Sequence, residues 1–125
     1  MSGSVEVKVS AGASPVSIRA TISSPHVQRV TIKPDGPAAR VHQWTGVGEG
    51  AVELGSVQEN RSADRVFTVT VESSDDEGQT FKPSAVRVSE VLTASRPAFH
   101  VVTVQAENDG DSDFDDALVH FSFIG

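Results

Sequence analysis

Residues 16–22 read Val16-Ser17-Ile18-Arg19-Ala20-Thr21-Ile22, a strict alternation of apolar and polar side chains. Successive side chains of a β-strand point to opposite faces, so this stretch predicts a strand with one buried face. The same period of two, rich in β-branched residues, recurs along almost the whole chain, and no segment shows a helical period. The pattern therefore predicts an all-β protein.

Nine segments carry the alternating pattern. They are Val5–Val9, Val16–Ile22, Val27–Lys33, Arg40–Trp44, Ala51–Leu54, Arg65–Val71, Ala85–Val91, His100–Gln105 and Ala117–Ile124. Turn-forming clusters lie between them, at Ser23–Pro25, Pro34–Pro37, Gly46–Gly50 and Ser73–Gly78. About nine short strands in 125 residues predict an antiparallel β-sandwich of Greek-key type, as a single domain over residues 1–125.

Composition excludes several classes of function. The chain has no Cys, which rules out disulfides, thiolate zinc sites and a cysteine nucleophile. It lacks a basic stripe that would contact nucleic-acid phosphates. It also lacks a signal-peptide pattern at its start and an apolar run of membrane-spanning length. We expect a soluble protein, either cytoplasmic or exported to the cell surface by a non-classical route.

Acidic residues are concentrated in one segment near the C-terminus. Residues 107–116 read Glu-Asn-Asp-Gly-Asp-Ser-Asp-Phe-Asp-Asp, with six acids and no base. The net charge of the chain is -7, but without these six acids it has 11 acidic and 10 basic residues. Carboxylates this close repel one another unless a cation neutralises them. The segment therefore predicts a local cation site.

The donor chemistry favours Ca²⁺, since hard carboxylate oxygens at alternating positions are the ligands that calcium prefers. An EF-hand is excluded, because a loop beginning at Asp109 has Phe114 where Gly is needed and His120 where Glu is needed. Six acids are more than one ion needs, so the segment is compatible with two closely spaced ions that share bridging carboxylates. The segment lies between two predicted strands, on a loop that the sheet holds in place.

Other polar features have simpler interpretations. The acids of Ser73–Gly78 are adjacent rather than alternating, which is typical of a solvated loop. Trp44 is interpreted as a core or interface residue, and His42, His100 and His120 have no zinc-ligand spacing. The glycines of Gly46–Gly50 lack the Lys and the helix of a phosphate loop.

The acidic segment resembles a known family. The string Glu107-x-x-x-Asp111-x-Asp113-Phe114-Asp115-Asp116-Ala117, followed by a strand and a C-terminal Gly125, is similar to the signature of calcium-dependent bacterial lectins of the fucose-binding lectin II type. The resemblance implies a lectin in which two Ca²⁺ ions coordinate the hydroxyls of a fucose or mannose residue. It also implies a homodimer or tetramer in which each C-terminal carboxylate enters a neighbour's site.

Carried over by position, the resemblance assigns the site residues. The metal ligands would be Glu107, Asp111, Asp113, Asp115, Asp116, Ser23 and, from the partner chain, Gly125. The sugar contacts would be Ser23, Ser24, Pro25, His26, Glu107, Asn108, Asp111, Asp113, Asp116 and Gly125. The chain departs from the family pattern where Ser23 and Asp115 stand in place of Asn, and its tail after Asp116 is one residue shorter.

Two other classes of function stay open from the residues alone. A calcium-stabilised structural or adhesion module without sugar affinity would use the same acidic loop. An enzyme would need a base and a nucleophile beyond the acids already required for metal, and none is recognisable, so we expect a non-enzymatic protein. The partner implied is a monosaccharide or glycan, with no nucleic acid and no membrane insertion.

Overall fold

A computed structural model of the chain describes residues 4–9, 15–35, 41–59, 65–74, 76–89, 92–95, 98–107 and 117–124. These residues form β1 (Ser4–Val9), β2 (Val16–Pro34), β3 (His42–Glu59), β4 (Arg65–Ser74), β5 (Lys82–Pro83), β6 (Ala85–Val88), β7 (Leu92–Ser95), β8 (Ala98–Glu107) and β9 (Ala117–Ile124). No helix long and apolar enough to span a membrane occurs among them.

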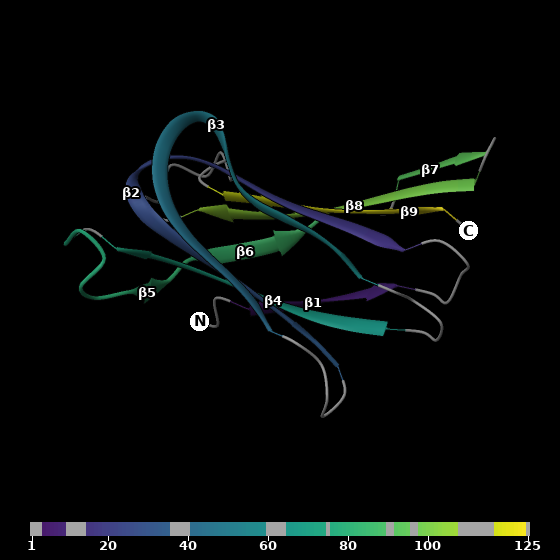
Figure 1. Cartoon of the computed structure of the whole chain (residues 1–125), viewed down its shortest axis with the longest axis horizontal. Helices are drawn as coiled ribbons and strands as arrows, with labels where there is room; N and C mark the ends of the chain where they lie inside the picture. The colour runs from purple at the N-terminus through teal and green to yellow at the C-terminus, as the bar shows by residue number, and fades with distance from the viewer. Residues whose placement is uncertain are drawn as a thin grey trace.

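All strand pairings among the described residues are antiparallel, and half of them join strands that are not consecutive in sequence, such as β1 with β4 and β2 with β9 (Figure 1). The order is β1-β4-β2-β9-β8-β6, with β3 paired to β2, β5 to β4 and β7 to β8. The predicted all-β, antiparallel fold class is therefore confirmed.

β2 and β3 form a two-stranded ribbon that bends back on itself (Figure 1). Val16 pairs with Glu59 at one end of the ribbon, and Ile32 pairs with His42 at the other. A straight strand as long as β3 would hold its ends about 55 Å apart. However, His42 Nε2 and Glu59 Oε1 are separated by only 2.5 Å. The bend lies near the middle of the ribbon, where Ser24 is opposite Gly48 and the register shifts on both sides.

The bend places the two halves of β2 in different layers of a sandwich. Residues 17–22 pair with β9, whose other neighbour is β8. Residues 27–34 pair with β4, whose other neighbour is β1. One strand thus belongs to both layers, which is a known way to turn a corner between packed sheets.

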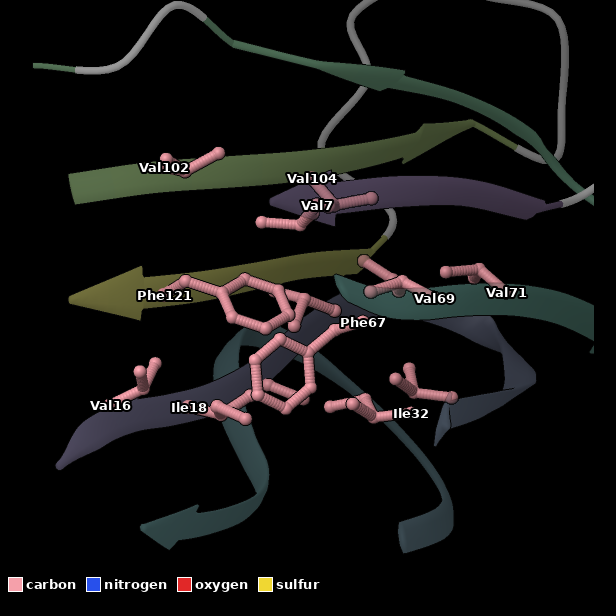
Figure 2. Close-up of a cluster of buried hydrophobic side chains, with 14 of the residues drawn as sticks. Val7, Val16, Ile18, Ile32, Phe67, Val69, Val71, Val102, Val104 and Phe121 are labelled. Atoms are coloured by element: carbon pink, nitrogen blue, oxygen red, sulfur yellow. The ribbon is translucent and has the colours of Figure 1, made fainter. Parts of the chain in front are cut away.

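The core fills the space between these layers (Figure 2). Phe67 of β4 and Phe121 of β9 are fully buried, with ring centroids 5.5 Å apart. Alternate residues of β2 face the same space, since Val16, Ile18, Ala20 and Ile22 are at most 1% exposed. The alternation that predicted the strand from the sequence is the alternation that forms the core.

The structure corrects two predicted strand boundaries. Ser23–Pro25 and Gly46–Gly50 were expected to be turns that separate strands, but they lie inside β2 and β3. The ladder continues through the corner because register shifts absorb the bend. Positive φ angles at Gly48 (155°) and Gly50 (84°) give β3 the necessary curvature. The turn residues mark the change of direction, although no strand ends there.

Trp44 holds the folded ribbon together. Its ring covers Gly55, where an added Cβ would lie 2.5 Å from ring atoms, so the two arms of β3 approach closely only with glycine there. Trp44 also packs against the hydrophobic core, and its ring stacks with that of His42 at a centroid distance of 6.3 Å. The structure agrees with a packing role for Trp44.

Candidate functional site

Three neighbouring strands bring Ser23 to both ends of the acidic loop. Ile22 of β2 pairs with Ala117, the first residue of β9, and Ala117 pairs with Ala106 of β8. The next residues are Ser23 on β2 and Glu107 at the end of β8. β8 ends at Glu107 and β9 begins at Ala117, so these two strand ends flank the acidic segment in the sequence. Two candidate ligands from distant parts of the sequence therefore lie at the same end of the sandwich.

Glu107 is a buried carboxylate at this end. It is 5% exposed and pairs with Ala85 of β6. Burying an ionised carboxylate is unfavourable unless hydrogen bonds, an ion pair or a metal compensates for its lost hydration. The burial of Glu107 therefore fits a carboxylate whose negative charge is compensated by other groups inside the protein.

The remaining candidates of the acidic loop lie outside the described residues. They are Asn108, Asp111, Asp113, Asp115 and Asp116, and the C-terminal Gly125 also lies outside. Within the ranges that the structure describes, no three His, Asp or Glu side chains gather to hold a metal ion. The assignments to these residues stay predictions.

The segment Ser23–His26 forms the bend of β2 and is braced by local hydrogen bonds. Ser24 is fully buried, and its hydroxyl accepts a hydrogen bond from the His26 amide (3.1 Å). The Ser23 hydroxyl accepts one from the Gly50 amide of β3 (3.2 Å). Pro25 is exposed, and Ser23 and His26 are partly exposed. The predicted contact segment is therefore fixed at both sides while part of its surface faces solvent.

Gln28 braces the same segment and was not among the predicted residues. Its side chain is fully buried, and Nε2 donates to the His26 carbonyl oxygen (3.3 Å). Its Oε1 has no hydrogen-bond partner in the described structure. The sequence carried a signal, since Gln28 occupies the inward position of the alternation that continues with Val30 and Ile32. An amide at a core position is rare without a polar task.

The turn that follows β4 lies next to this segment, because Val27 pairs with Ser74. The Ser74 hydroxyl donates to Asp76 Oδ1 (2.5 Å) and accepts a hydrogen bond from the Gly78 amide (2.9 Å). The Thr80 amide also donates to Asp76 Oδ1 (2.8 Å). The hydrogen bonds to the Asp76 carboxylate, first from the Ser74 hydroxyl and then from Thr80, lower the pKa of Asp76 to about 2. The turn is thus an organised structure.

A cavity of about 280 Å³ opens between the bend of β2, β3 and this turn. It is lined by Pro25, His26, Val27, Val47, Ser74 and Glu77. Pro25 and His26 were predicted site residues, whereas Val47, Ser74 and Glu77 were not. Their contribution depends on the folded ribbon and on the pairing of β2 with β4, which no local motif reveals.

Comparisons with known proteins identify the family and the fold of this chain. The family model for fucose-binding lectin II (PA-IIL) matches residues 7–124. The comparison with curated proteins gives no significant match.

Solved structures show the same fold. The Chromobacterium violaceum lectin CV2L in complex with alpha-methyl-fucoside is 20% identical, with a TM-score of 0.70 over 93% of this chain and 94% of that one. A Ralstonia solanacearum high-affinity mannose-binding lectin is 18% identical, with a TM-score of 0.70 over 94% of each chain. The C-terminal domain of the BC2L-C lectin from Burkholderia cenocepacia is 14% identical, with a TM-score of 0.70 over 96% and 97%. The family match spans nearly the whole chain and confirms the resemblance found in the acidic segment: this protein belongs to the fucose-binding lectin II family.

Proposed function

We propose that this protein is a calcium-dependent lectin that binds a terminal fucose or mannose residue at the end of the sandwich formed by β2, β8 and β9. The observation that carries the proposal is the register that places Ser23 beside both ends of the acidic loop, at Glu107 and Ala117. The family supports carbohydrate binding without catalysis. Fucose and mannose are the sugars named for two of the structural relatives.

The donor set fits two calcium ions. Glu107, Asp111, Asp113, Asp115 and Asp116 supply carboxylate oxygens, and Ser23 supplies a hydroxyl. Hard oxygen donors of this number and charge suit calcium, and two divalent cations would offset the repulsion among six acids. When bound, the ions would accept two neighbouring hydroxyls of the sugar as ligands. The burial of Glu107 supports a role for its charge inside the site.

The protein's own residues orient the sugar in this proposal. Ser23, Ser24, Pro25 and His26 form a braced edge, and part of this edge faces solvent. A braced edge loses little conformational entropy on binding, which favours affinity for a small ligand. Asn108 is proposed as a polar contact to the sugar from the acidic loop.

The subunit arrangement is proposed from the same family. The terminal carboxylate of Gly125 would enter a neighbouring subunit's site, which makes the lectin a homodimer or a larger assembly. Adding residues after Gly125 should then weaken sugar binding by moving the charge away. Sedimentation and calorimetry of the extended and original chains test this together, and unchanged affinity would remove the partner carboxylate from the site.

The proposal is tested by calorimetry on chelator-treated protein. Calcium should bind and raise the melting temperature, and methyl α-fucoside or methyl α-mannoside should bind only when calcium is present. Asp113→Ala should abolish both, while Glu6→Ala, an exposed acid on β1, should alter neither. Calcium-dependent melting without sugar binding would indicate a structural module instead. Sugar binding that persists in excess chelator would refute the calcium-mediated mechanism.

A further inference from the structure

A cavity beside the proposed sugar site is suited to a second sugar ring. The cavity of about 280 Å³ shares Pro25 and His26 with the predicted contact segment and extends from there towards β3 and the turn after β4. This volume lies just below the range of about 300–1,000 Å³ that is usual for drug-sized ligands, which fits a smaller group such as one sugar ring. Its described lining residues lie outside the acidic loop, and Val27, Val47, Ser74 and Glu77 are not part of the proposed monosaccharide site.

The order of contacts along β2 connects the two places. At its start, the Ser23–His26 segment follows Ile22, which pairs with Ala117 at the end of the acidic loop. At its other end it is followed by Val27, which pairs with Ser74 on the cavity wall. A sugar bound at the acidic loop would thus have the cavity next to it, across a segment of four residues. Only a ligand that continues beyond its first ring can reach both.

The cavity lining combines the apolar and polar residues that sugars require. Pro25, Val27 and Val47 supply apolar contacts, and Val47 is 53% exposed although it is a large aliphatic residue. His26, Ser74 and Glu77 supply polar atoms on the rest of the wall. A pyranose presents C–H groups on one face and hydroxyls at its rim, so it matches apolar contact on one side and acceptors on the other.

Glu77 is held at this wall by an organised turn. Its φ angle is 63°, the one positive φ of a non-glycine residue in the described chain. The hydrogen bonds of Ser74 and Asp76 fix the turn on both sides of it. Glu77 is exposed and lines the cavity, so its carboxylate is positioned to accept hydrogen bonds from ligand hydroxyls.

We propose that this protein recognises an oligosaccharide rather than an isolated monosaccharide, with the cavity at His26, Val47 and Glu77 binding the sugar that is linked to the terminal residue. The inference rests on the proposed function, since the terminal residue occupies the calcium site. Glu77 accepts hydrogen bonds from hydroxyls of the second ring, and Val47 contacts the apolar face of that ring. Glu77 is therefore a residue that determines specificity.

The test compares methyl glycosides with disaccharides by calorimetry in calcium. The disaccharides carry terminal fucose or mannose in different linkages. At least one should bind roughly tenfold more tightly than the matching methyl glycoside, the factor expected from one or two hydrogen bonds to a charged group. Glu77→Gln and Val47→Ala should each remove most of this advantage while leaving methyl glycoside affinity unchanged. The control Glu6→Gln changes an acid that lines a different cavity and should keep the advantage.

The outcomes separate this inference from the proposed function. If the methyl glycosides bind but no disaccharide binds more tightly, the second-ring site is refuted and the lectin proposal stands. If a disaccharide is preferred and both Glu77→Gln and Val47→Ala retain the full preference, the assignment of the cavity is refuted. If neither class of sugar binds, the proposed function itself fails. Circular dichroism melting of each variant verifies that it is folded.

Discussion

Replacing Gln28 by Leu should change stability and sugar affinity in opposite directions. Gln28 is fully buried, and its two polar atoms are in different situations. Nε2 donates to the His26 carbonyl oxygen at 3.3 Å, whereas Oε1 has no partner in the described structure. Leu has a similar volume and removes both polar atoms. The substitution therefore removes one long hydrogen bond, from Nε2 to the His26 carbonyl oxygen, and also removes one buried acceptor, Oε1, that has no donor.

The magnitudes decide the sign for stability. A net hydrogen bond contributes about 1 kcal/mol, and a buried unsatisfied polar atom costs about 1–3 kcal/mol. The apolar atoms of Leu add roughly a further 1 kcal/mol by burial. We therefore expect Gln28→Leu to raise the free energy of unfolding by about 1–3 kcal/mol. For a chain of this length that corresponds to a melting temperature roughly 4–12 °C higher.

Sugar affinity should fall because the His26 carbonyl loses its donor and the bend of β2 becomes less well fixed. Loss of one such brace, about 1 kcal/mol, corresponds to an affinity roughly fivefold lower. Melting is measured in chelator, so that bound calcium does not contribute, and affinity is measured by calorimetry in calcium. A variant that is less stable than the parent by more than about 1 kcal/mol in chelator would refute the account of Oε1 as unsatisfied.

Three further changes test other parts of the structure. Ser84→Ala should leave the free energy of unfolding unchanged or raise it by up to about 1–2 kcal/mol in urea titrations, because the buried Ser84 Oγ also lacks a hydrogen-bond partner in the described structure. A clear loss of stability would contradict the view that this hydroxyl is unsatisfied. Gly55→Ala should lower the free energy of unfolding by about 1–3 kcal/mol, because the added Cβ would lie 2.5 Å from the Trp44 ring. Sugar affinity should be unchanged. An unchanged melting temperature would show that the Trp44 ring can move aside. Burial, and to a smaller extent Arg19, lowers the pKa of His120 from its usual 6.5. As the pH falls below about 6.5, His120 is therefore protonated in the unfolded chain before it is protonated in the folded protein, and the free energy of unfolding decreases. His120→Gln should remove that part of the decrease between about pH 7 and 5, and an identical pH profile for the two proteins would count against it.

Much of the fold followed from local pattern. The alternation in Val16–Ile22 predicted both the strand and its buried face, and the predicted boundaries of the last strand, Ala117–Ile124, match β9. The corner of the β2 and β3 ribbon did not follow. Turn residues at Ser23–Pro25 and Gly46–Gly50 locate a change of direction, but whether the hydrogen-bond ladder continues through it depends on pairing between segments that are distant in sequence.

The family was predictable because the signature that carries it is local. The composition of the acidic loop predicts a cation, which stays a prediction, and the family match confirms the lectin resemblance that the loop suggested. The places of Gln28 and Glu77 depend on tertiary structure, since Gln28 donates to the His26 carbonyl oxygen and Glu77 lines the cavity to which we assign a second sugar ring. A buried Gln in an alternating strand is the one signal that the sequence offered for them.

The distribution of buried polar groups links the corner to its function. The described residues include five buried polar or charged side chains, at most 5% exposed: Ser24, Gln28, Ser74, Ser84 and Glu107. Ser24, Gln28 and Ser74 lie in or next to the bend of β2, and Ser84 precedes Ala85, which pairs with Glu107 at the end of β8. The apolar core, by contrast, occupies the space between the two layers. Polar burial lowers stability unless each group is satisfied, so folding alone gives no reason to gather these groups at one end. Their arrangement is explained if the corner serves to hold the Ser23–His26 edge in one conformation beside the acidic loop.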